Sequence, residues 1–134
     1  IRLTSDVNRE GIPAISLLQD SSTFTAAIND FDPKDLFKRN LRTLAKPEDI
    51  LLVISTSGNS ENITEALKEA KELGIETLGF LGSGGGKALS FCNLSFVVPS
   101  NETARIQEVH ITAGHALIQF VESRLFEEDF FNLN

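Results

Sequence analysis

Residues 50–60 read ILLVISTSGNS, an apolar run that passes directly into a polar turn. Five apolar residues without alternation predict a central parallel strand that is covered on both faces, at residues 50–54. Behind the turn, apolar residues recur at helical spacing as far as Gly74, which predicts a helix that ends at this glycine. They are Ile63, Ala66, Leu67, Ala70 and Leu73. The order of strand, polar turn and helix is typical of an α/β fold.

The same alternation continues on both sides of this unit. Further apolar runs predict strands at residues 13–18, 77–81 and 94–98. Helical spacing predicts a short helix through residues 26–28 after possible N-caps at 20–23, a second helix at 34–44, and a long one at 102–126. We therefore predict an α/β fold, a three-layer open parallel sheet with flanking helices, as one domain over residues 1–134.

Composition and charge narrow the range of partners. The chain has 134 residues, 41% of them hydrophobic, and its 19 acidic and 12 basic residues give a net charge of −7. This charge argues against nucleic acid as a partner but leaves small anions open. A single cysteine, Cys92, cannot form an internal disulfide and is predicted to be a small core residue. No segment resembles a signal or a membrane span, so we expect a cytoplasmic protein without a membrane partner.

The polar turn at residues 55–60 has the features of an anion site. Hydroxyl residues cluster there between the end of a buried strand and the start of a helix, where free N–H groups and the helix dipole favour a phosphate. They are Ser55, Thr56, Ser57 and Ser60. Gly58 would let the backbone approach the anion closely. The alternative is that Asn59 or Ser60 is only an N-cap for the following helix.

A second glycine-rich segment, residues 82–86 followed by Lys87, resembles a nucleotide-binding loop only superficially. A P-loop would need glycine at Leu81 and a hydroxyl residue at Ala88, and a dinucleotide fingerprint would need glycine at Lys87. We predict a tight strand-to-helix turn, which remains a candidate lining of the anion pocket.

The two histidines of the chain, His110 and His115, lie on the predicted long helix. Five helical residues turn through about 500°, so the two side chains point about 140° apart and do not form a shared metal pair. A lone helical histidine is most often a hydrogen-bonded interior or interface residue. His115 follows Gly114 in an apolar stretch, so we expect some group to meet its imidazole. Arg105 could balance a phosphate or pair with a neighbour, and the apolar second half of the helix predicts a partner surface.

Three segments together resemble a known family. They are residues 55–60, the glycines at 84–86, and residues 103–111 (TARIQEVHI) with His115. In this order and spacing they resemble the sugar isomerase (SIS) domain of phosphoheptose isomerases, also called sedoheptulose 7-phosphate isomerases, over most of residues 13–125. The resemblance implies a flavodoxin-like SIS fold. It also implies that the N-terminal third of the domain, with a helix, the first strand and a glycine-rich loop, lies upstream of Ile1. The start at Ile1 and the absence of methionine agree with a fragment.

The resemblance assigns roles to particular residues. The family's serine-rich loop binds the sugar phosphate, which implies this role for Ser55, Thr56, Ser57 and Ser60. Its Asn-Asp pair falls on Asn29 and Asp30, which would contact substrate. Its last helix supplies a glutamine and a histidine near a zinc ion and the reacting carbons, and these fall on Gln107 and His115. Their Cα atoms would lie about 12 Å apart along the helix on faces about 80° apart, so both side chains would have to reach inward to share one metal.

The implied activity is aldose–ketose isomerisation of sedoheptulose 7-phosphate to D-glycero-D-manno-heptose 7-phosphate through an enediol, as in heptose synthesis for lipopolysaccharide. His115 would serve ring opening or proton transfer at the oxygens, and zinc would polarise the carbonyl. The resemblance implies that the family's proton-abstracting glutamate would lie upstream of Ile1, so residues 1–134 alone are expected to be inactive. The family implies a homotetramer. The alternative is a non-catalytic SIS module, such as a sugar-phosphate sensor or an adaptor for a replication initiator, and the presence of His115 favours the enzyme.

Overall fold

The computed structural model describes residues 11–18 and 20–126. Its centre is a parallel sheet of three strands, β1 (Ile50–Ser55), β2 (Glu76–Leu81) and β3 (Leu94–Val97), in the order β1-β2-β3. Ser55 lies opposite Leu81, and Leu81 lies opposite Val97. The carboxyl ends of all three strands therefore meet at one edge of the sheet. The predictions of strands at 50–54, 77–81 and 94–98 are confirmed within one residue.

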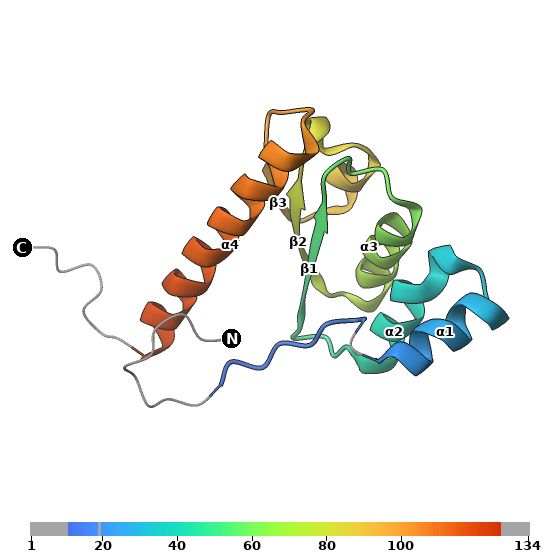
Figure 1. The fold of residues 1–134 in the computed structure, drawn as a ribbon. Helices are drawn as coiled ribbons and strands as arrows, with labels where there is room; N and C mark the ends of the chain where they lie inside the picture. Colours follow the sequence, from blue (N-terminus) through green and yellow to red (C-terminus); the bar gives the residue numbers. More distant parts are fainter. Residues whose placement is uncertain (1–10, 19, 127–134) are drawn as a thin grey trace, which may run out of the picture.

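Helices lie on both sides of this sheet. In chain order the structure has α1 (Ser21–Asp30), the 3₁₀ turn η1 (Pro33–Asp35), α2 (Leu36–Leu44), α3 (Glu61–Leu73), the 3₁₀ turns η2 (Ser83–Gly85) and η3 (Lys87–Phe91), and α4 (Thr103–Phe126). The first three α-helices lie to one side of the strands and α4 lies to the other (Figure 1). The predicted three-layer α/β architecture is confirmed.

The local start and stop signals are placed as the sequence predicts. Asp20 is the N-cap of α1, and its carboxylate accepts hydrogen bonds from the N–H groups of Ser22 at 3.0 Å and Thr23 at 3.2 Å. The hydroxyl of Thr23, followed by these backbone N–H groups, lowers the pKa of Asp20. Gly74 ends α3 in the left-handed conformation with φ of 70°. These signals depend only on neighbours in sequence, which is why they could be predicted.

The strand predicted at residues 13–18 is wrong. Residues 11–16 have no regular structure, and Leu17 and Leu18 form a turn. The Asn40 side-chain amide donates a hydrogen bond to the Leu17 carbonyl at 2.8 Å, but no strand pairs with this segment among the described residues. An apolar run indicates a preference for extended backbone, and it becomes a strand only where a neighbouring strand supplies the hydrogen-bond ladder.

The hydrophobic core fills one face of the sheet. Leu51 and Val53 of β1 pack there against Ala66, Leu67 and Ala70 of α3, and all five are buried. The opposite face of β1 is open, since its alternate residues are exposed: Ile50 by 70%, Leu52 by 45% and Ile54 by 57%. The prediction that this strand is covered on both faces is therefore wrong within the described part of the chain. The helix on that side, α4, leaves the face of β1 uncovered.

The long helix α4 confirms the predicted element but carries much apolar surface. Its exposed apolar residues are Val109, Ile111, Phe120, Leu125 and Phe126. The sheet does not cover them, which agrees with the expectation that this helix needs more than its own sheet. No helix in the described ranges is both long and apolar enough to cross a bilayer. Cys92 is partly buried and packs against the core, where burial raises the pKa of its thiol.

Candidate functional site

The serine loop, residues 55–60, joins the end of β1 to the start of α3. The Oγ of buried Ser55 accepts a hydrogen bond from the Gly58 N–H at 3.0 Å, and the Oγ of Ser57 accepts one from the Asn59 N–H at 3.1 Å. A serine hydroxyl has one proton to donate in addition to its acceptor lone pairs. Both oxygens accept from the loop's own backbone, and neither hydroxyl proton is donated to another group among the described residues.

The side chains of Asn59 and Ser60 do not act as simple helix caps. Ser60 holds the N-cap position of α3 without a side-chain capping hydrogen bond. The Asn59 amide is used within the loops, since it donates to the Ser57 carbonyl at 3.1 Å and accepts from the Lys87 N–H at 3.1 Å. Ser60 thus has the cap position of the predicted alternative, but its side chain makes no capping hydrogen bond. This arrangement favours the anion site, because the helix start keeps a free hydroxyl.

The glycine-rich segment at residues 82–86 packs against the backbone of the serine loop. Gly58 has φ of +62°, and a Cβ atom there would overlap the carbonyl of Gly85. A Cβ atom on Gly86 would lie 2.5 Å from the Ser57 carbonyl oxygen. The Ala88 N–H also donates to the Gly58 carbonyl at 2.9 Å. The segment is therefore the predicted tight turn, and the close approach at Gly58 is to protein backbone rather than to an anion.

The N-terminal half of α4 reaches the same edge of the sheet. Ile106 is 1% exposed, and its side chain lies so close to Gly82 that a Cβ atom there would be 2.6 Å from the Ile106 Cδ1. That added atom would also lie 2.5 Å from the carbonyl oxygen of Thr56 in the serine loop. One turn further along, His110 is buried and hydrogen-bonded to the end of β2. His110 is therefore a hydrogen-bonded interior residue, as expected for a lone helical histidine.

The other candidate residues make no hydrogen bond or ion pair with the serine loop within residues 11–18 and 20–126. Gln107 and His115 are both exposed on α4, and His115 follows Ile106 by nine residues, about 14 Å along the helix. No group within the described residues meets the His115 imidazole, although the sequence predicts one. Asn29 and Asp30 are exposed at the C-terminal end of α1, without a contact to the loop in the described part of the chain. Their roles stay predictions.

Arg105, near the start of α4, pairs with a neighbour. Its guanidinium lies 2.7 Å from the carboxylate of Glu108, and both side chains are more than half exposed. Of the two expectations for this residue, the structure therefore shows the ion pair on its own helix. An exposed pair of this kind contributes about 0–1 kcal/mol.

A zinc ion does not fit the described side chains by themselves. Zinc in proteins takes about four ligands, of which a catalytic site supplies three from protein side chains. Gln107 and His115 could supply two ligands, and residues 11–18 and 20–126 contain no cluster of three or more histidine, cysteine, aspartate or glutamate side chains suited to a metal. Zinc therefore stays a prediction.

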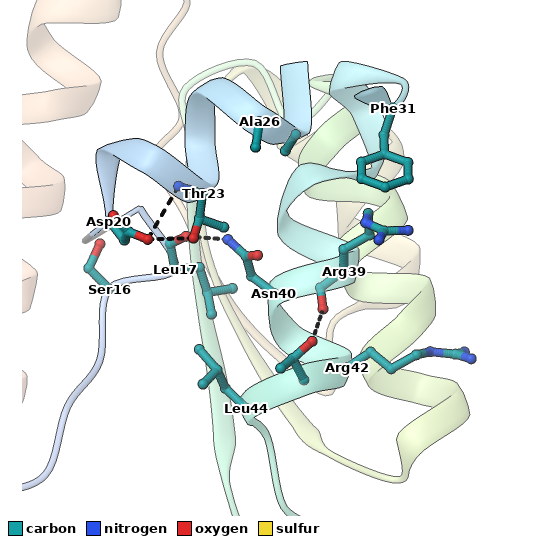
Figure 2. Close-up of a pocket in the computed structure, with 12 residues that line it drawn as sticks. Ser16, Leu17, Asp20, Thr23, Ala26, Phe31, Arg39, Asn40, Arg42 and Leu44 are labelled. Carbon is teal, nitrogen blue, oxygen red and sulfur yellow. Dashed lines mark hydrogen bonds between the residues drawn. The ribbon is translucent and has the colours of Figure 1, made fainter. Parts of the chain in front are cut away.

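A cavity lined by other residues is separate from the serine loop. It has a volume of about 580 Å³ and is lined by Ser16, Leu17 and Asp20 together with residues of α1 and α2 (Figure 2). Three polar side chains of the lining contact other lining residues. The Thr23 hydroxyl donates to the Asp20 carboxylate, the Asn40 amide donates to the Leu17 carbonyl, and the Arg39 guanidinium stacks on the Phe31 ring. The contact with Phe31 leaves the N–H groups of Arg39 free to donate, so the cavity keeps donors for an anion. The serine loop remains the better candidate site because it lies at the carboxyl edge of the parallel strands.

Sequence reasoning missed two contributors to this site. Asn59 ties the serine loop to the glycine-rich segment, and Gly82 admits Ile106 of α4 beside Thr56. Both contacts join residues more than twenty positions apart. The only local signal was the density of glycines at residues 82–86, which indicates close backbone packing without naming its partner.

Comparisons with known proteins agree with this geometry. A family model described as SIS domain matches residues 4–82. Phosphoheptose isomerase of Clostridium acetobutylicum is 47% identical over 122 residues, which are 91% of this chain and 62% of that protein. The corresponding protein of Aquifex aeolicus is 45% identical over 119 residues, or 89% of this chain and 62% of its own.

Solved structures give the same result. A phosphoheptose isomerase from Francisella tularensis superposes with a TM-score of 0.83 at 36% identity, covering 86% of this chain and 62% of that one. One from Neisseria gonorrhoeae gives a TM-score of 0.78 at 37% identity, covering 80% and 61%. The chain thus spans about three fifths of the length of these relatives. The chain has a parallel sheet with a hydroxyl-rich loop at its carboxyl edge, and the family model matches more than half of its residues. The chain belongs to the SIS domain family.

Proposed function

We propose that the protein is a sugar-phosphate aldose–ketose isomerase that converts sedoheptulose 7-phosphate to D-glycero-D-manno-heptose 7-phosphate through an enediol. The observation that carries the proposal is the serine loop, in which the Ser55 and Ser57 hydroxyls accept backbone hydrogen bonds and keep their protons for a phosphate. The similarity to phosphoheptose isomerases, at 47% identity for the Clostridium acetobutylicum protein, supports the substrate class.

The loop would work mainly by binding and orientation. Hydroxyl protons of Ser55, Thr56, Ser57 and Ser60 would donate to the phosphate oxygens, together with the N–H groups at the start of α3. Phosphate contacts are remote from the carbons that exchange a proton, so their binding energy orients the sugar rather than changing the bond itself. The loop can do this without a cation, because oriented N–H and hydroxyl groups point their positive ends at the anion.

The remaining roles belong to the same proposal. His115 would transfer protons at the sugar oxygens, and Gln107, Asn29 and Asp30 would contact the substrate. In zinc-containing protein, Gln107 and His115 would be two of the ligands. Self-association into a homotetramer is supported by the exposed apolar residues of α4 and of the open β1 face.

The direct test is turnover of sedoheptulose 7-phosphate by the full-length protein, followed as formation of the aldose. We expect measurable activity that falls by about 100-fold or more in the His115→Ala variant, the usual scale for loss of a proton-transfer group. Undiminished turnover in this variant would remove His115 from the mechanism. Phosphate binding without any turnover by the parent protein would instead favour the non-catalytic sugar-phosphate sensor.

The phosphate assignment has its own test in the double variant Ser57→Ala with Ser60→Ala. Loss of two hydrogen bonds to a charged ligand is expected to weaken binding of inorganic phosphate by about 100-fold or more, measured by calorimetry. The matched control is Ser95→Ala, which removes an exposed hydroxyl on β3 away from the loop. An unchanged phosphate affinity in the double variant would contradict the assignment of the loop.

A further inference from the structure

A single buried polar contact joins α4 to the end of the central strand β2. His110 is 5% exposed, and its Nε2 lies 3.0 Å from the carbonyl oxygen of Leu81. A carbonyl oxygen can only accept, so Nε2 carries the proton and Nδ1 has the free lone pair. Nδ1 is buried and has no hydrogen-bond partner among the described residues. The ring is therefore held in place by one directional contact, beside the Phe80 ring at 5.9 Å between centroids.

The carbonyl that His110 contacts is already part of the edge where the serine loop begins. Leu81 is the last residue of β2, and its carbonyl also accepts the Val98 N–H at 2.8 Å. Leu81 lies opposite Ser55, whose carbonyl accepts the Gly82 N–H at 3.2 Å. His110 thus binds the backbone one strand away from the first residue of the serine loop.

The contact matters because α4 touches the sheet along a narrow stripe. Ile106, His110 and Gly114 recur at four-residue spacing, and a Cβ atom on Gly114 would lie 3.9 Å from the Phe80 ring. Ile106 packs tightly beside Gly82, but apolar packing of this kind has no preferred direction of its own. A shift by one residue turns a helix by about 100° and moves it by about 1.5 Å. Of these three residues, the hydrogen bond of His110 alone specifies both rotation and height.

We propose that His110 is a positioning residue for the isomerase: its bond to the Leu81 carbonyl sets the rotation and height of α4 against the serine loop. Gln107 lies three residues before His110 and His115 lies five residues after it on the same helix. The positions of both side chains therefore depend on how His110 places the helix. The bond thereby determines where these two side chains stand relative to a phosphate held by the loop. This inference rests on the proposed function.

The experiment compares two substitutions in the full-length protein. His110→Phe keeps a ring but removes the N–H donor, whereas His110→Gln keeps an N–H donor on a side chain of similar reach. We expect His110→Phe to lower kcat by about tenfold or more, since small misplacements of reacting groups are costly. The Kd for inorganic phosphate should change by less than about twofold, because other hydrogen bonds hold the serine loop. His110→Gln should recover most of kcat.

The control is Thr112→Ala, whose hydroxyl donates only to the Glu108 carbonyl of the same helix at 2.9 Å. It should leave kcat and phosphate affinity unchanged. A His110→Phe enzyme with the parent's kcat would overturn the proposal, as would an equal loss in the glutamine variant. Ring ¹⁵N resonances give a readout independent of turnover, and a proton found on Nδ1 would also overturn it. If the parent protein has no isomerase activity, the proposed function fails first, and the tautomer still shows whether the bond exists.

Discussion

The Gly58→Ala variant is expected to lose about 3–5 kcal/mol of unfolding free energy, the range of the severe single substitutions. Two causes combine at this position. The backbone has φ of +62°, which disfavours any residue with a Cβ atom, and that atom would overlap the Gly85 carbonyl. The overlap is with backbone, so relief requires the serine loop and the glycine-rich segment to separate. Urea unfolding of the purified variant measures the loss, and phosphate binding should disappear with it.

Gly74→Ala separates the two causes at Gly58. Gly74 has a similar φ of +70°, but a Cβ atom there would have nothing within 4 Å. This control should lose only the conformational part, about 1 kcal/mol. If Gly58→Ala cost no more than Gly74→Ala, the close packing of the two loops would be refuted.

The Ile106→Ala variant is expected to lose about 2–5 kcal/mol, the usual cost of truncating a buried isoleucine. Ile106 is 1% exposed and fills the space beside Gly82 where α4 meets the sheet. Because α4 touches the sheet along a narrow stripe, the remaining contacts should not compensate for the cavity. Urea unfolding gives the free energy, and hydrogen exchange of the α4 amides should accelerate relative to those of α3.

The matched control is Ile111→Ala on the same helix, where the side chain is 60% exposed. Removing the same atoms from an exposed position should change stability by about 0.5 kcal/mol or less. Equal losses at both positions would contradict the placement of Ile106 as the anchor of α4. A concentration-dependent loss confined to Ile111→Ala would instead support the proposed self-association.

Much of the fold was predictable because its signals are local. The apolar run at residues 50–54, the helical spacing up to Gly74 and the cap at Asp20 all depend on neighbours in sequence, and the structure confirms each of them. The strand predicted at residues 13–18 and the two-sided cover of β1 failed. Both predictions depended on segments distant in sequence. The strand at residues 13–18 needed a neighbouring strand for its hydrogen bonds, and the cover of β1 needed a layer packed on its second face.

The candidate site likewise has features that could be predicted from local sequence and features that could not. Its hydroxyl residues and its place at the carboxyl edge of the sheet could be predicted, because residues 55–60 lie between a strand and a helix. The contacts between the serine loop and the glycine-rich segment could not, because they join residues more than twenty positions apart. Nor could the sequence show which histidine is buried.

The order of residues along the chain was enough to establish the α/β class, the end of α3 at Gly74 and the presence of a hydroxyl-rich loop. These features arise from interactions over a few residues, whose energies the local sequence sets. The packing of Gly58 against Gly85, the bond from His110 to Leu81 and the exposure of His115 followed only from the folded chain. They depend on how distant segments approach one another, and that approach is set by the packing of the whole core.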